Sequence, residues 1–206
     1  MSTGAINRAP TYDYNKMTEK QVLAIFNKTN AFLKGHFRLS SGLHSEGYLQ
    51  CALVLQYPKY AKLLCTELAK KFEDEKPSVV IAPAIGGIIV SYEAARALGC
   101  RSMFTEREND IMTLRRGFTF KKSDRVVVVE DVVTTGGSTK EVIGVVRGRG
   151  AKVIGVGAII DRSCGGINFG IEFNSLIKLE IMTYKPEECP LCKKGVPVVK
   201  PGSKRI

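Results

Sequence analysis

The sequence predicts an α/β fold: a Rossmann-like, mostly parallel sheet flanked by helices, with a small N-terminal hood. Short apolar strands alternate with helical segments from Ser78 to Ile160, and this alternation is typical of a parallel sheet covered on both faces. Before it, a turn-rich segment from Gly35 to Gly47 separates two short strands. We therefore expect the hood to precede the sheet along the chain.

The hood is expected to contain one helix and one hairpin. Thr18 is a good N-cap, and apolar residues at helical spacing follow it as far as Gly35, so this stretch predicts an amphipathic helix that includes Phe32. Strands over Phe37–Leu39 and Tyr48–Cys51 then flank the turn residues Ser40-Ser41-Gly42.

The core is expected to alternate strands and helices. Its predicted helices are Pro58–Phe72, Gly87–Leu98 and Ser138–Arg147, and its predicted strands are Val79–Ala82, Arg101–Thr105, Phe118–Phe120, Val126–Glu130 and Val153–Ile160. Ligands of such sheets bind beyond the carboxyl ends of the strands. Three loops therefore become candidates for the functional site: Pro83–Gly87, Asp131–Ser138 and Asp161–Gly166.

Length and composition are those of one globular domain. With 206 residues, 44% apolar and 25% charged, the chain can bury a full core, and a disordered or fibrous protein is excluded. We divide it into a hood of about residues 1–55, an α/β core of about 56–185 and a basic tail of 186–206. Neither a membrane-length apolar run nor a signal-peptide pattern is visible, so we expect a cytoplasmic protein without a membrane partner.

The chain is strongly basic. It has 31 Lys and Arg against 20 Asp and Glu, a formal net charge of +11. Such an excess fits either general solvation or a polyanionic partner, which is a nucleic acid or a phosphorylated small molecule. Few aromatic residues lie among the basic ones, so a stacking platform for single strands is not expected.

The stretch from Val126 to Ser138 carries the clearest chemical signal. Four valines form a strand, and then come two carboxylates, two valines, two threonines, two glycines and a serine. Glycines and hydroxyls at a helix N-terminus suit a phosphate, whereas carboxylates suit ribose hydroxyls and positive charge developing on a sugar. The expected phosphate contacts are Thr134, Thr135, Gly136, Gly137 and Ser138, and the expected ribose contacts are Glu130 and Asp131. The alternative is a purely structural strand–turn–helix; the stretch matches neither a Walker loop nor GxGxxG.

The pair Cys189-Pro-Leu-Cys192 has the CxxC spacing of half a zinc site. No second CxxC follows, and His36 and His44 lie far upstream. We therefore expect no complete set of metal ligands and assign no metal-binding residue. Whether these two cysteines bind a metal or pair with each other stays open at this point.

Three segments resemble known enzymes. Residues 126–138 resemble the signature of type I phosphoribosyltransferases, Gly35–Gln50 is similar to the N-terminal block of orotate phosphoribosyltransferases, and Ile160-Asp-Arg162 matches the place of an orotate-binding arginine in that family. The resemblance implies the type I phosphoribosyltransferase fold and transfer of phosphoribose from phosphoribosyl pyrophosphate (PRPP) to orotate. It implies that PRPP is bound by Glu130, Asp131, Val132, Val133, Thr134, Thr135, Gly136, Gly137, Ser138 and Arg107, with Glu130 and Asp131 catalytic. Thr134 and Arg162 would contact orotate.

The same resemblance implies Mg²⁺ bound mainly through PRPP, and a homodimer with a shared active site. Some residues depart from the family pattern. Gly86 and Ser40 stand where many relatives have lysines, and the stretch Glu106–Gly117 has three arginines but neither the lysine nor the histidine of the family's mobile loop. Those lysine and histidine roles therefore do not carry over.

Two alternative functions remain at this stage. One is a purine-type phosphoribosyltransferase, which would need a different base-reading hood. The other is a PRPP-sensing regulator that binds nucleic acid without turnover. No helix-turn-helix or RNA-binding motif is readable in the sequence, so nucleic acid is not an expected partner.

Overall fold

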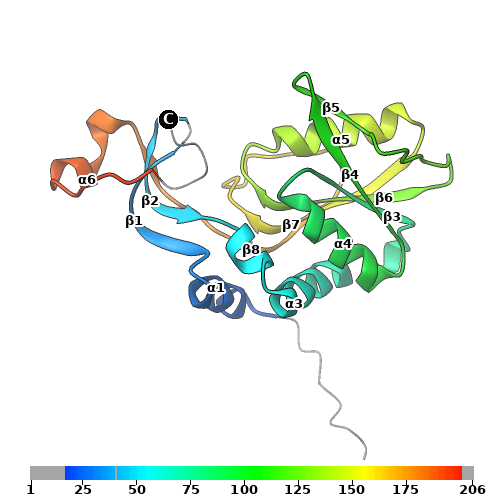
Figure 1. Ribbon diagram of the computed structural model, residues 1–206, viewed down its shortest axis with the longest axis horizontal. Helices are drawn as coiled ribbons and strands as arrows, with labels where there is room; N and C mark the ends of the chain where they lie inside the picture. Colours follow the sequence, from blue (N-terminus) through cyan, green and yellow to red (C-terminus); the bar gives the residue numbers. More distant parts are fainter. Residues whose placement is uncertain (1–16, 40, 201–206) are drawn as a thin grey trace, which may run out of the picture.

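The computed structural model describes residues 17–39 and 41–200. Figure 1 shows a large layered lobe and a smaller lobe beside it. The large lobe contains a six-stranded sheet in the order β5-β4-β3-β6-β7-β8, and the smaller lobe contains a three-stranded sheet in the order β1-β2-β9.

The six-stranded sheet is parallel except at one edge, as the sequence predicts. Its strands are β3 (Val79–Pro83), β4 (Arg101–Glu108), β5 (Ile111–Thr113), β6 (Arg125–Val133), β7 (Lys152–Asp161) and β8 (Phe173–Lys178). Only β5 runs antiparallel to its neighbour. The chain passes from β3 outward to β4, and from β6 outward to β7 on the other side. The strand order therefore reverses between β3 and β6, where ligands of open α/β sheets bind.

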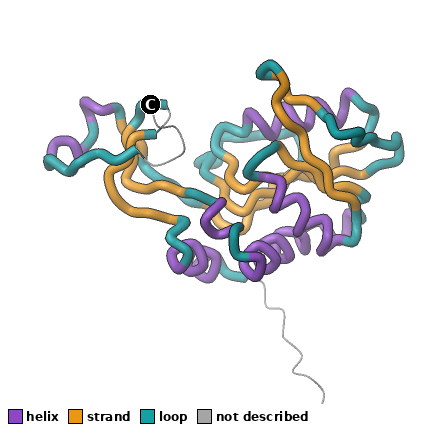
Figure 2. Tube along the Cα trace, in the orientation of Figure 1, coloured by secondary structure: helices purple, strands orange, loops and turns teal. Residues whose placement is uncertain are grey.

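Helices cover both faces of this sheet (Figure 2). Alternate residues of a strand point to opposite faces: Val80 and Val127 pack into one core with helices α1 (Glu19–Lys28), α3 (Pro58–Ala69) and α4 (Gly87–Leu98). Val79 and Val126 point into a second core that contains α5 (Gly137–Gly148). Both faces of the strands are thus apolar, which explains the continuous valine runs. In the described ranges, no helix has the length and apolar character needed to cross a membrane.

The hood contains the predicted helix and hairpin, with different boundaries. Thr18 and Gln21 form a capping box at the start of α1, which confirms the predicted N-cap. The helix ends at Lys28, not near Gly35, because Asn30 has a φ of 53° and breaks the helical path. Phe32, predicted as helical, begins strand β1 (Phe32–Arg38), which pairs with β2 (His44–Leu49). A short helix α2 (Ala52–Leu55) follows.

The C-terminal segment returns to the hood. Strand β9 (Thr183–Tyr184) pairs with β2, and a single parallel bridge joins Phe37 to Val199. Two short helices, η2 (Pro186–Glu188) and α6 (Pro190–Lys193), lie between them. The small lobe is therefore built from both ends of the described chain (Figure 1).

One predicted strand is wrong. Residues Phe118–Phe120 have no strand pairing, and β5 at Ile111–Thr113 is the strand that pairs with β4. The apolar alternation that suggested the strand serves packing instead: Phe118 lies edge-to-face against Phe104, with ring centroids 5.3 Å apart. Helix α3 also ends earlier than predicted, and a 3₁₀ helix, η1 (Lys70–Glu75), completes that stretch.

Candidate active site

The loop between β6 and α5 has the form of a phosphate cradle. Strand β6 ends at Val133 and α5 begins at Gly137, so the N-terminus of α5 opens onto this loop. Gly136 has a φ of 71°, and a Cβ there would lie 3.0 Å from the Phe169 ring, so only glycine fits without strain. Thr134 and Thr135 are exposed. Accessible hydroxyls and free helix N–H groups together suit an anion.

The acidic pair lies half-buried at the end of β6. Burial, and to a smaller extent the charge of Asp131, raise the pKa of Glu130 to about 7, although the Thr139 hydroxyl donates to its carboxylate. Burial also raises the pKa of Asp131 above its usual value, against the opposing effect of backbone N–H groups and of the Cys51 thiol, which donates to it. Two carboxyls held this way favour the arrival of hydrogen-bond donors or positive charge.

The loop Pro83–Gly87 lies against the same pair. A Cβ on Gly86 would lie 2.9 Å from each carboxylate oxygen of Asp131. The backbone that begins α4 therefore packs directly on the acidic pair, at the reversal point between β3 and β6. A Cβ at position 86 would therefore require the Asp131 carboxylate to shift.

Arg162 lies beside the cradle, directly after β7. Its backbone N–H donates to the Val133 carbonyl at 2.8 Å, and burial lowers the pKa of its guanidinium. Its Nε is buried, and within residues 17–39 and 41–200 it has no hydrogen-bond partner. An unpaired buried donor is costly, so this guanidinium suits a ligand that supplies an acceptor.

The arginines of the β4–β5 region lie farther along the same edge and are ion-paired within the chain. Arg107 Nη2 lies 2.7 Å from Glu141 Oε2 on α5, one helical turn after Gly137. Arg116 donates twice to Glu106, at 2.7 and 2.9 Å, and Arg115 lies 3.4 Å from Glu108. The structure thus gathers the β6–α5 loop, the acidic pair and Arg162, and places Arg107 near them but already paired. Ser40 lies outside the described residues.

Sequence reasoning missed several contacts of the site. Cys51 and Thr139 hydrogen-bond to the acidic pair, and Gly86 packs on it. Thr139 could have been suspected because it lies one residue after the predicted loop, whereas no sequence signal links Cys51 to a strand 80 positions away.

The expectation of an incomplete metal-ligand set also needs correction. Potential ligand atoms of His36, His44, Cys189 and Cys192 all lie within 4.8 Å of one another. Separation along the sequence was a poor guide here because the segment that follows β9 lies against the β1–β2 hairpin.

Comparisons with known proteins show what this chain is similar to. Residues 54–180 match the phosphoribosyl transferase domain family. An orotate phosphoribosyltransferase of Pelotomaculum thermopropionicum is 57% identical over 190 residues, which are 92% of this chain and 100% of the relative. One of Caldanaerobacter subterraneus subsp. tengcongensis is 58% identical over the same shares of the two chains. The crystal structure of orotate phosphoribosyltransferase from Aeropyrum pernix aligns with a TM-score of 0.66 at 27% identity, covering 77% of this chain and 93% of that one.

Proposed function

The chain belongs to the orotate phosphoribosyltransferases, and from this premise we propose the role of each part of its site. The enzyme transfers the phosphoribosyl group of PRPP to orotate, which yields orotidine 5′-monophosphate and pyrophosphate in pyrimidine biosynthesis. The purine-type and regulatory alternatives are therefore set aside.

PRPP is bound by the segment from the acidic pair to the start of α5. The observation that carries this assignment is the continuous run of a half-buried carboxyl pair, a left-handed glycine and a helix N-terminus. The 5-phosphate accepts hydrogen bonds from the loop, and the ribose hydroxyls donate to the carboxylates. The residues of this PRPP segment are Glu130, Asp131, Val132, Val133, Thr134, Thr135, Gly136, Gly137 and Ser138.

The reaction needs positioning and charge stabilisation more than a strong base. A ring nitrogen of orotate forms a bond to the anomeric carbon while the bond from that carbon to the pyrophosphate oxygen breaks, and the pyrophosphate leaves with the electron pair. The sugar becomes oxocarbenium-like between these events, and Glu130 and Asp131 stabilise its positive charge. The proton on that ring nitrogen is lost as the new bond forms, and the departing pyrophosphate, itself a base, can take it. No side chain of the enzyme therefore has to act as a strong base.

Orotate is held by Arg162 and Thr134. The buried guanidinium of Arg162 has an unpaired Nε–H, and a planar carboxylate can accept from it in a fork geometry. Thr134 is exposed at the end of β6, next to the strand from which Arg162 emerges, and its hydroxyl can reach the same ligand.

Mg²⁺ fits this site as an ion that arrives with PRPP. In residues 17–39 and 41–200, the His/Cys cluster in the hood is the only group of three or more potential metal ligands. The described part of the transfer site therefore has no carboxylate cage of its own for a metal ion. Mg²⁺ prefers oxygen ligands, keeps several waters, and neutralises pyrophosphate charge when bound.

We also propose a cytoplasmic homodimer. Arg107 would exchange Glu141 for the pyrophosphate in the neighbouring subunit's site, as the family's mobile loop does. All six cysteines are free, which suits a reducing compartment.

A substrate comparison tests the function. Purified protein is given PRPP and Mg²⁺ with orotate, guanine or hypoxanthine, and pyrophosphate release is followed. We expect turnover with orotate alone, and a large loss in the Asp131→Asn variant. Turnover with a purine and none with orotate would overturn the assignment.

A further inference from the structure

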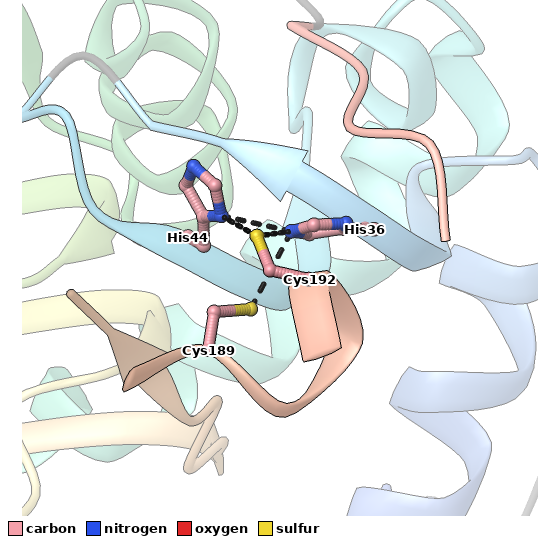
Figure 3. A group of neighbouring side chains, drawn as sticks. All are labelled: His36, His44, Cys189 and Cys192. Carbon is pink, nitrogen blue, oxygen red and sulfur yellow. Dashed lines mark hydrogen bonds between the residues drawn. The ribbon is translucent and has the colours of Figure 1, made fainter. Parts of the chain in front are cut away.

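Four metal-ligating side chains converge in the hood, outside the transfer site (Figure 3). His36 on β1 and His44 on β2 face Cys189, which directly precedes α6, and Cys192, which lies within α6. We propose that these four residues bind one structural Zn²⁺ ion in a closed Cys₂His₂ site.

The distances between the ligand atoms fit a tetrahedral zinc site. Zn–S bonds of about 2.3 Å and Zn–N bonds of about 2.0–2.1 Å place sulfur and nitrogen ligands about 3.5 Å apart. The sulfur–nitrogen distances are 3.4 Å from Cys189 to His36 Nε2, 3.7 Å from Cys192 to His36 Nε2, and 3.2 Å from Cys192 to His44 Nδ1. The two ring nitrogens are 2.9 Å apart, against about 3.3 Å expected for two nitrogen ligands of zinc. The other two pairs of ligand atoms, Cys189–His44 and Cys189–Cys192, lie within 4.8 Å, so small side-chain movements are needed to bring all four atoms onto one ion.

The tautomer of His36 is already set for binding a metal. Its Nδ1 lies 2.8 Å from the Val196 carbonyl oxygen, which can only accept, so Nδ1 carries the proton. The lone pair of neutral His36 is therefore on Nε2, the atom that points into the cluster. Histidines that bind zinc typically donate such a hydrogen bond from the ring nitrogen that does not bind the metal to a carbonyl oxygen.

The burial of most of these side chains favours a bound metal ion over a cluster without one. Three of the four residues are buried: His36 is 3% exposed, His44 7% and Cys189 0%. Polar groups buried together need strong partners, and both cysteines are free thiols. A disulfide would employ the two sulfurs and leave the histidine pair without a role, whereas one zinc ion satisfies all four ligand atoms. Two nitrogens and two sulfurs are ligands that zinc prefers.

The position of the site indicates its role. The Val199 N–H donates to the His36 carbonyl, and the Arg38 N–H donates to the Val199 carbonyl, each at 2.8 Å. The His36–Val196 bond described above and a bond from the Tyr184 hydroxyl to Glu46 at 2.7 Å also join this segment to the hairpin. A zinc ion would join residues more than 140 positions apart and so fix the tail onto the β1–β2 hairpin.

Metal content tests the proposal without any transfer assay, so its outcome is independent of the proposed activity. The full chain is produced with zinc in the medium, kept reduced, and analysed by elemental mass spectrometry. We expect about one zinc per chain, and a loss of most of it in both Cys189→Ser and Cys192→Ser. Cys164→Ser is the matched control, because Cys164 is an exposed free thiol outside the cluster, and it should keep the full zinc content.

Cobalt substitution is a second measurement that needs no variant. Co²⁺ in the wild-type protein should give the intense visible absorption of a tetrahedral site and a thiolate charge-transfer band. Zinc-free protein under zinc supply, iron in place of zinc, a Cys189–Cys192 disulfide in reduced preparations, or equal zinc in wild type and both cysteine variants would each overturn the proposal.

Discussion

Replacement of Arg162 by alanine should separate orotate binding from PRPP binding. The guanidinium Nε is buried without a partner in the described chain, so it gains a full charge-assisted bond when a carboxylate arrives. Hydrogen bonds to charged groups contribute about 1.5–3 kcal/mol, and each 1.4 kcal/mol corresponds to about a factor of ten in affinity. We therefore expect Arg162→Ala to raise the KM for orotate by about 10- to 150-fold.

Stability should change little in this variant. Removal of the side chain relieves an unsatisfied buried N–H but also removes the packing of its aliphatic stem. We expect the two effects to offset each other, so that the free energy of unfolding changes by no more than about 1 kcal/mol. The backbone bond from residue 162 to the Val133 carbonyl remains possible with alanine.

Steady-state kinetics with each substrate varied in turn, together with urea unfolding, provide the measurement. Arg162→Lys is the matched control: it keeps the charge but loses the planar fork, so its orotate KM should lie between those of wild type and Arg162→Ala. A rise in the KM for PRPP with the orotate KM unchanged would refute the placement of the base site. A large loss of stability would show that the arginine has a structural partner in the free protein.

Four further predictions concern the acidic pair and Arg107. Asp131→Asn should lower turnover by ~10²-fold or more with an unchanged circular dichroism spectrum; near-wild-type kinetics would contradict its role. Gly86→Ala places a Cβ 2.9 Å from the Asp131 oxygens and should lower kcat by about tenfold or more. The control Gly144→Ala, with open space around the added Cβ, should keep full activity. Equal kcat in both variants would argue against the contact. The pKa of Glu130 is raised to about 7 from 4.5, so between these pH values the native state holds a proton that the unfolded state has released. The free energy of unfolding of the wild type should therefore fall relative to that of Glu130→Gln as pH rises through this window. Unfolding curves at about pH 4 and about pH 8 test this, and a pH-independent difference would refute it. Mixing Arg107→Ala chains with Asp131→Asn chains should restore part of the activity if the site is shared, because one of the two sites in the hybrid then has both wild-type groups; mixtures no more active than the parents would count against a shared site.

The ion pairs of the β4–β5 region bear on that last experiment. Arg107, Arg115 and Arg116 each have an acidic partner on their own chain. These pairs are exposed, so each contributes little to stability and can exchange partners at low cost. An arginine that closes over pyrophosphate would first leave its carboxylate, and added salt should weaken both interactions.

The sequence by itself determined the features that depend on neighbouring residues. The β6 strand, its carboxyl pair, the glycine turn and the start of α5 lie in one run of thirteen residues, so local chemistry is enough to predict a strand–turn–helix suited to phosphate and ribose. That this segment binds PRPP is a proposal that rests on the resemblance to the family. Helix α4 was predicted with its observed boundaries, and the parallel sheet follows from apolar strands alternating with helices. Arg162 could be placed because it directly follows the β7 strand.

Only the tertiary structure decided contacts between distant segments. Gly86 meets Asp131 because β3 and β6 are neighbours across the reversal point of the sheet, and Cys51 reaches the same carboxylate from the hood. The predicted strand at Phe118–Phe120 failed because apolar alternation does not distinguish strand pairing from aromatic packing. The four-residue cluster of His36, His44, Cys189 and Cys192 forms because the tail returns to the β1–β2 hairpin. Such pairings depend on which strand edges meet in space, and no local pattern specifies that choice.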